Sequence, residues 1–119
     1  MAHSVCVIST RAPYHGQSAR EALDTVLVSA SYDIETSFLL MGDGVYQLLK
    51  GQDAGQIPRK TISAMLQVLP LYGIDTIYVD QASLKERSIT PDVLQEGVTV
   101  LAEGELPQFI QQHSKVFNF

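Results

Sequence analysis

Short apolar runs alternate along the chain with segments in which apolar residues recur at helical spacing. Apolar runs of four to eight residues are typical of β-strands, and the chain has them at residues 5–8, 34–41, 74–79, 98–101 and 116–119. In the segments between these runs apolar side chains recur every three or four positions, and helices are predicted at residues 19–30, 45–49, 62–69 and 106–113. A short polar helix is predicted near residues 83–87. His113 continues the apolar stripe of the last helix, so we expect a structural role for it.

This alternation predicts an α/β fold. Strands joined through helices pair in parallel, and the helices pack on both faces of the resulting sheet. The run at residues 5–8 (VCVI) is rich in β-branched residues, as in strands whose two faces are both covered. We expect three layers, with a mainly parallel five-stranded sheet between helices. The 119 residues fit one domain, and no linker or repeat divides them, so we expect a single domain over residues 1–119.

Hydroxyl, glycine and aspartate residues follow the first three predicted strands. The carboxyl ends of parallel strands meet at one edge of a sheet, and ligands of α/β proteins bind at that edge. A loop with an aromatic residue and a histidine follows the first strand and lies near the same edge. The sequence therefore predicts a strand-end site or subunit interface built from Ser9, Thr10, Tyr14, His15, Gly42, Asp43, Gly44 and Asp80.

Cys6 is the only cysteine, and it lies in the middle of the first predicted strand. A single cysteine excludes an internal disulfide, a paired-cysteine redox motif and a cysteine-based metal cluster. Reactive thiols need exposure and a neighbour that stabilises the thiolate, and the interior of a buried strand offers neither. Buried free cysteines usually pack as small hydrophobic residues. We therefore expect Cys6 to be part of the core.

His15, Asp43 and Asp80 are the other candidates for chemistry. A loop histidine is a general base only where it faces a reacting partner, so a structural contact is the favoured interpretation for His15. Two aspartates suit a divalent cation, but a turn role for Asp43 and a helix-capping role for Asp80 explain each one locally. Two alternatives stay open. One is a small nucleotide- or metal-dependent enzyme that uses Ser9, Thr10, Asp43 and Asp80, and the other is a homo-oligomeric interaction module.

The formal net charge is −5, and the eight lysine and arginine residues are scattered. Proteins that bind nucleic acid directly need a basic surface that displaces counterions from phosphates, so no direct contact with nucleic acid is expected. No apolar stretch has the length that spans a bilayer, and the start of the chain has no signal-peptide pattern, so we expect a cytoplasmic protein without membrane contact. Charged residues make up 18%, below the usual ~25%, which favours a partner that covers part of the surface.

Five segments, taken together in their order and spacing, resemble the DsrE/DsrF-like family, and most closely its TusC/DsrF branch of sulfur-relay proteins. A short terminal strand that ends in Phe119 completes the likeness, which runs nearly end to end. The segments are residues 8–16 (ISTRAPYHG), 19–24 (AREALD), 42–49 (GDGVYQLL), 71–74 (LYGI) and 82–87 (ASLKER).

The resemblance implies a non-catalytic structural subunit, without a cofactor, in a relay that supports 2-thiolation of the wobble uridine of certain tRNAs. It also implies TusB-like and TusD-like partner subunits, with two copies of each chain in the complex. In that family the TusD-like subunit carries the sulfur-accepting cysteine near the start of the helix after a central strand. The resemblance places Asp80 at approximately this point, and an aspartate cannot form a persulfide. It leaves open whether the sulfur goes to tRNA or to a dissimilatory sulfur pathway.

Overall fold

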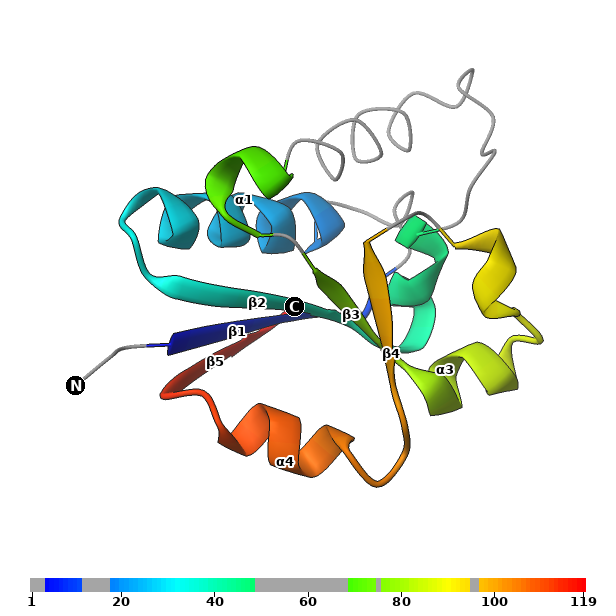
Figure 1. The fold of residues 1–119 in the computed structure, drawn as a ribbon. Helices are drawn as coiled ribbons and strands as arrows, with labels where there is room; N and C mark the ends of the chain where they lie inside the picture. The colour runs from blue at the N-terminus through cyan, green and yellow to red at the C-terminus, as the bar shows by residue number, and fades with distance from the viewer. Residues whose placement is uncertain (1–3, 12–17, 49–68, 75, 95–96) are drawn as a thin grey trace, which may run out of the picture.

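Five strands form one sheet in the computed structural model of the protein, which describes residues 4–11, 18–48, 69–74, 76–94 and 97–119 (Figure 1). The strands lie side by side in the order β4-β3-β2-β1-β5, and every neighbouring pair is parallel. Their bounds are β1 (Ser4–Ser9), β2 (Glu35–Leu40), β3 (Ile77–Asp80), β4 (Val98–Leu101) and β5 (Lys115–Asn118). The predicted parallel five-stranded sheet is confirmed.

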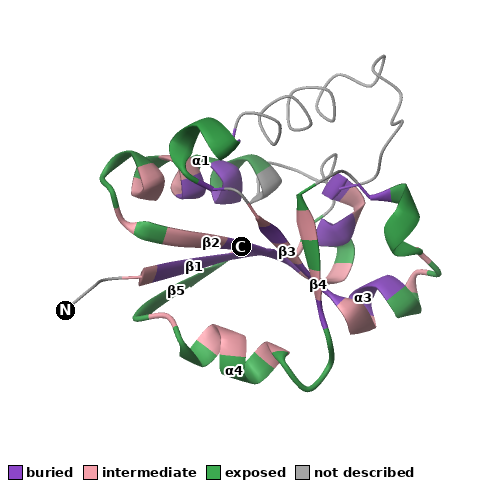
Figure 2. Cartoon of the chain, in the orientation of Figure 1, coloured by how far each residue is buried: buried purple, intermediate pink, exposed green. Residues whose placement is uncertain are grey.

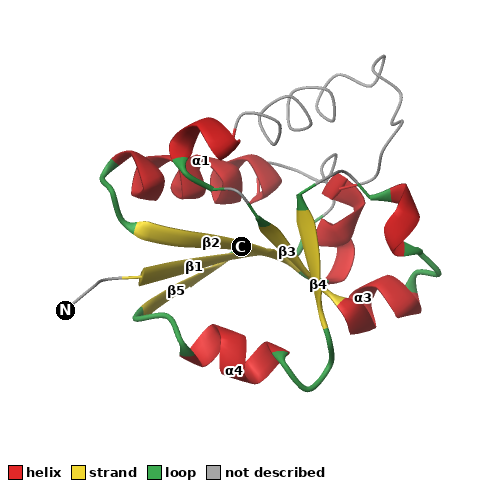
Figure 3. Ribbon diagram, in the orientation of Figure 1, coloured by secondary structure: helices red, strands yellow, loops and turns green. Residues whose placement is uncertain are grey.

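Helices lie on both faces of this sheet (Figure 3). One face is covered by α1 (Ser18–Ser31), and the opposite face by α4 (Leu106–Gln111). The α-helix α3 (Gln81–Glu86) follows β3 directly at the carboxyl edge. Three shorter segments are 3₁₀-helices, namely η1 (Gly42–Leu48), η2 (Leu69–Tyr72) and η3 (Pro91–Val93). Among the described helices, none combines the length and the apolar character that crossing a membrane requires.

Three differences from the sequence prediction matter for the fold, besides shifts of one or two residues at other element ends. Ile74 is not part of the third strand, because its N–H donates to the Leu69 carbonyl at 3.2 Å and closes η2 instead of pairing in the sheet. Pro70 does not end a helix but is the second residue of η2, while residues 62–68 of the helix predicted there lie outside the described part. The predicted turn from Gly42 to Gly44 forms the first residues of η1.

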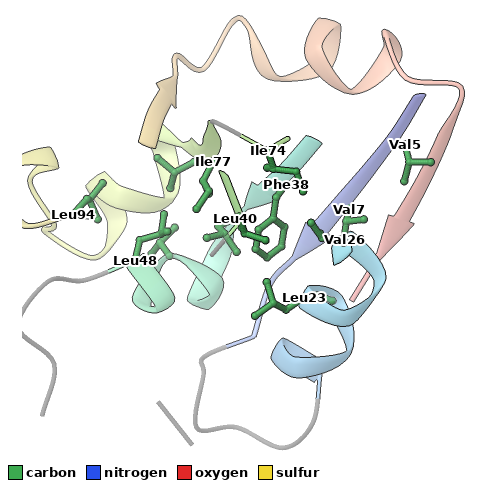
Figure 4. Close-up of a cluster of buried hydrophobic side chains, with 14 of the residues drawn as sticks. Val5, Val7, Leu23, Val26, Phe38, Leu40, Leu48, Ile74, Ile77 and Leu94 are labelled. Atoms are coloured by element: carbon green, nitrogen blue, oxygen red, sulfur yellow. The ribbon is translucent and has the colours of Figure 1, made fainter. Parts of the chain in front are cut away.

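The core lies on both sides of the sheet because successive residues of a strand point to opposite faces. Val5 and Val7 of β1 belong to the larger cluster, and Figure 4 shows Leu23 and Val26 of α1 beside this strand. The smaller cluster lies under α4 and is formed by Cys6, Ile8, Leu39 and Leu101 with partly buried Met41, Tyr78, Leu106, Phe109 and Ile110. All described residues of β1 except Ser4 are buried, whereas β5 is exposed along its whole length (Figure 2).

His113 joins α4 to the sheet. Its Nδ1 lies 2.9 Å from the Phe109 carbonyl oxygen, and its Nε2 lies 2.9 Å from Ser37 Oγ in β2. A carbonyl only accepts hydrogen bonds, so Nδ1 carries a proton, and in the neutral ring Nε2 accepts from the serine hydroxyl. The ring also packs 5.0 Å from that of Phe109, which in turn lies 4.5 Å from Tyr78. These contacts confirm the structural role predicted for His113.

Replacing His113 with alanine should lower the free energy of unfolding by about 1–3 kcal/mol, because two partly buried hydrogen bonds and a ring contact are lost. Urea denaturation followed by circular dichroism measures this change. Gln112→Ala, at the exposed neighbouring position, is the matched control and should change stability by less than about 0.5 kcal/mol. Equal stabilities of the two variants would contradict the proposed anchoring role.

Candidate functional site

The end of β1 and the start of η1 approach each other more closely than a side chain allows. A Cβ atom built on Gly44 would overlap the Ser9 carbonyl oxygen and lie 2.9 Å from the Ser9 carbonyl carbon. The same carbonyl accepts the Met41 N–H at 3.1 Å, and the Met41 carbonyl accepts the Gly44 N–H at 2.9 Å. Only glycine therefore fits at residue 44. The close contact of Gly44 with Ser9, and the bond from Met41 to the same carbonyl, hold the ends of β1 and β2 together.

Ser83 links the same turn to the end of β3. Its Oγ accepts the Gly42 N–H at 2.8 Å and donates to Asp80 Oδ2, also at 2.8 Å. Asp80 is the N-cap residue of α3, but its carboxylate makes no capping bond to a helix amide. The capping role predicted for Asp80 is therefore wrong in its detail, because the carboxylate accepts from the Ser83 hydroxyl instead. Asp80 and Ser83 are both 6% exposed, so this bond is shielded from solvent.

Asp43 is held by an arginine from α3. Both Nε and Nη2 of Arg87 donate to Asp43 Oδ1, at 3.1 and 2.9 Å, and Nη1 donates to the Ser83 carbonyl at 3.1 Å. The Arg87 side chain is 19% exposed, whereas that of Asp43 is 61% exposed. The arginine thus fixes an outward-facing carboxylate at the carboxyl edge. No local sequence signal predicts this pair, because 44 residues separate its members.

Gln47 is a buried polar residue that the sequence analysis missed. Its Nε2 donates to Ser9 Oγ at 2.8 Å and to the Arg11 carbonyl at 3.0 Å, and the residue is 1% exposed. Its Oε1 has no hydrogen-bond partner among the described residues. One feature of the sequence could have identified Gln47: it is a glutamine in an otherwise apolar run (VYQLL), three residues after Gly44.

Of the remaining predicted site residues, the structure describes Thr10 but not Tyr14 or His15. Thr10 donates through both its backbone N–H and its Oγ1 to the Phe119 carbonyl, at 2.9 and 2.8 Å, which ties the end of β1 to the last residue. Tyr14 and His15 lie outside the described residues. The structure therefore brings Ser9, Gly42, Asp43, Gly44 and Asp80 together in one network through Met41, Ser83 and Arg87, while Thr10 lies beside Gly42 and bonds with Phe119.

Within this network, the polar side chains at the carboxyl edge are engaged in hydrogen bonds with other residues of the chain. The side chains that an enzyme would use there each have a partner inside the chain: Ser9 bonds with Gln47, Thr10 with Phe119, Asp43 with Arg87 and Asp80 with Ser83. Across the described ranges, no three histidine, cysteine, aspartate or glutamate side chains gather in a group that would hold a metal ion. The arrangement is suited to holding the shape of a surface.

Cys6 lies away from this edge, in the cluster under α4. It is fully buried among hydrophobic side chains, as predicted. Desolvation by this burial raises the pKa of the Cys6 thiol to about 11. The thiol is therefore protonated at neutral pH and shielded from reagents, and both properties oppose a role as a nucleophile.

Comparison with known proteins identifies similar chains. The model of the DsrE/DsrF-like family matches residues 3–119. A TusC homologue from Pseudomonas aeruginosa is 37% identical over 116 residues, which cover 98% of each chain. The intracellular sulfur oxidation protein DsrF of Allochromatium vinosum is 42% identical over 89 residues, 75% of this chain and 65% of that protein. The crystal structure of the ychN protein from E. coli matches with a TM-score of 0.83 at 25% identity over the whole of both chains.

Gly44→Ala should lower the free energy of unfolding by about 3 kcal/mol, the upper end of the range for over-packing, because the new methyl group overlaps a backbone oxygen that cannot move aside. Gly104→Ala is the matched control, since nothing lies within 4 Å of a Cβ built there. The measurement is urea denaturation of both variants. Equal midpoints would show that β1 and η1 can separate at little cost.

The Cys6 thiol should resist alkylation by iodoacetamide in the native protein at pH 8 and react fully in denaturant.

The raised pKa of Cys6 also makes stability depend on pH, because the thiol ionises in the unfolded chain at a lower pH than in the folded chain. This contribution is complete below about pH 8.5, the usual pKa of cysteine, and is lost as the pH rises through 11. Wild type should therefore lose more stability than Cys6→Ala between pH 8.5 and 11. Parallel curves for the two proteins would show that the thiol is already accessible.

Proposed function

The chain belongs to the DsrE/DsrF-like family, and from that membership we propose that it is a non-catalytic subunit of a sulfur-relay complex. The similar chains support sulfur chemistry, because one is a TusC homologue and another is an intracellular sulfur oxidation protein. The match to the TusC homologue extends over 98% of each chain, which favours the TusC-type role.

The observation that carries the proposal is the burial of the only cysteine. A protein that accepts sulfur as a persulfide must present a thiolate to the donor, and then present the loaded sulfur to the next carrier. Cys6 is fully buried with a pKa raised to about 11, so it meets neither requirement. The sulfur must then travel on another subunit. Asp80, at the start of the helix after β3, stands where we expect the sulfur-carrying relative to have its cysteine.

The proposed partners are TusB-like and TusD-like chains, with two copies of each of the three subunits, and the proposed product is 2-thiouridine at the wobble position of tRNA. No cofactor is required of a subunit in this role. The net charge of −5 agrees with RNA contact through other subunits. A process that acts on tRNA places the complex in the cytoplasm.

The carboxyl edge is the proposed contact with the sulfur-carrying subunit. Its backbone is fixed by the approach of Gly44 to β1 and by the bonds of Ser83. Asp43 is the outward-facing charge, held by Arg87, and would meet a cationic or amide donor on the partner. Tyr14 and His15, which follow β1 in the sequence, are the remaining members of the proposed interface. A surface whose side chains are already positioned loses little entropy when it binds.

Deleting the gene should lower the 2-thiouridine content of tRNA, and the wild-type gene should restore it. Cys6→Ala should restore it nearly as well, because the thiol takes no part in the relay. The measurement is mass spectrometry of nucleosides from purified tRNA, with the level of each variant protein checked by immunoblotting.

Two outcomes would contradict this proposal. A persulfide trapped on Cys6 in the native protein would make the chain a sulfur carrier. Unchanged 2-thiouridine after deletion would remove tRNA as the destination of the sulfur.

A further inference from the structure

Residues 102–119, which contain α4 and β5, contribute little to the hydrophobic core. No residue of this segment is buried, and its half-buried residues are Leu106, Phe109, Ile110, His113 and Phe119. Figure 2 shows the segment in green and pink, whereas β1, β2 and β3 each contain buried residues. Segments with few buried apolar contacts open at a lower free energy than the core strands. We call residues 102–119 the strap.

The strap is joined to the sheet along one strand. Because β5 is the last strand in the order, it pairs only with β1. Further bonds hold its ends: the Ser4 N–H donates to Ser114 Oγ at 2.8 Å, and the Phe119 N–H donates to the Ile8 carbonyl at 2.8 Å. His113 adds its bond to β2. Detaching the strap would therefore break one strand pair and leave β1–β2, β2–β3 and β3–β4 intact.

The turn between β4 and α4 can act as a hinge. Two hydrogen bonds close it internally, because the Ala102 N–H donates to Glu105 Oε1 and the Glu105 N–H donates to the Ala102 carbonyl, both at 2.9 Å. Nothing lies within 4 Å of a Cβ built on Gly104. An exposed ion pair of Glu103 with Lys85, at 3.9 Å, links the turn to α3, and such pairs contribute little to stability. Rotation at this turn therefore disturbs few contacts with the rest of the described chain.

The strap covers the face of β1 to which Cys6 points. Cys6 and Ile8 alternate along β1 with Val5 and Val7, which belong to the larger cluster on the α1 face. Cys6 is fully buried and lies opposite Val116 of β5 in the strand register. The other face of β1 is covered by α1, which contacts both β1 and β2. Opening the strap would expose Cys6 and would remove only the partly buried last residue from the larger cluster.

We propose that the strap detaches from β1 as one unit while the rest of the fold persists, and that this opening is the gate through which solvent and small reagents reach Cys6. The closed strap shields the thiol, and the open strap gives it the exposure of an unfolded chain. A local equilibrium then sets the accessibility of the only cysteine, in place of global unfolding. The inference goes beyond the proposed function, because it concerns a motion of the chain by itself and requires no partner.

The gate also makes the state of the thiol responsive to binding. A ligand or partner that favours the closed strap lowers the population of the open form, and it protects Cys6 by the same factor. The same physical reason makes the hydrogen bonds of the strap the point at which the gate is tested, since weakening them raises the population of the open form.

The test measures the rate at which iodoacetamide alkylates Cys6 in the full native chain, followed by mass spectrometry of the intact protein. His113→Ala removes the bond to β2 and should raise the rate about tenfold, which corresponds to about 1.4 kcal/mol. Ser114→Ala removes two bonds to Ser4 at the other end of the strap and should raise the rate about threefold or more. Gln112→Ala, at an exposed position of the strap, is the matched control and should react at the wild-type rate.

Val26→Ala distinguishes opening of the strap from global unfolding. Val26 is fully buried in α1 on the opposite side of the sheet, so this substitution lowers the melting temperature without removing a contact of the strap. Cys6 of this variant should react at the wild-type rate. Hydrogen exchange measured by NMR is the second readout, and the amides that β5 bonds to β1 should exchange through an opening that depends less on urea than the opening that exposes those of β2.

The outcomes decide between the two routes to the thiol. Faster alkylation in the two strap variants but not in Val26→Ala would support the gate. Equal acceleration in Val26→Ala and His113→Ala would show that Cys6 reacts only after global unfolding, and this result would overturn the inference. Wild-type rates in both His113→Ala and Ser114→Ala would overturn it as well. None of these rates depends on a partner subunit, so the result is independent of the proposed function.

Discussion

The pairing of β5 with β1 determines the state of the only cysteine. Without β5 and the α4 segment that leads into it, one face and one edge of β1 would be open to solvent. Burial alone does not hold β5 in place, because all four of its residues are exposed. Hydrogen bonds at its two ends do so: Ser114 bonds reciprocally with Ser4 at the start of β1, and Phe119 bonds with Ile8 and Thr10 at its end. The thiol of Cys6 is therefore kept inert by backbone pairing at the opposite end of the sequence.

The fold could be predicted from the sequence because local patterns carry it. The period of apolar residues distinguishes strands from helices, and the strand at residues 98–101 was placed at its observed bounds. Ile74 was misplaced because an apolar residue beside a strand gives the same pattern whether it pairs in the sheet or closes a preceding turn. The site was predicted less completely. Ser9 and Asp43 were identified from their place after a strand, but their partners Gln47 and Arg87 come from 38 and 44 residues away, a separation at which no periodic pattern remains.

The carboxyl edge of this chain differs from that of most α/β proteins. In most α/β proteins this edge is open and lined by groups that bind a ligand. Here the groups at this edge pack against and bond with one another. Gly44 lets η1 pack directly on β1, and Ser83 joins the start of η1 to Asp80 through two hydrogen bonds. The hydroxyl and carboxylate groups that suggest catalysis in the sequence are the ones that stiffen the surface. Fold and residue type alone therefore mislead here, and the hydrogen-bond partners determine the interpretation.

In the proposed role, a small domain leaves its chemistry to other subunits and has to hold them at fixed positions. Opposite edges of one sheet would serve this purpose, because a close-packed core has low compressibility and keeps the two edges in a fixed relation. The two edges of this chain also differ in character. The carboxyl edge is polar, with Asp43 held by Arg87, whereas Tyr32, Leu71 and Tyr72, near the amino ends of β2 and β3, are exposed. Different surfaces bind different partners, since each would leave apolar area or charge uncompensated against the wrong one. In the proposed role, the 18% content of charged residues has a physical reason, because partner subunits would cover part of the surface.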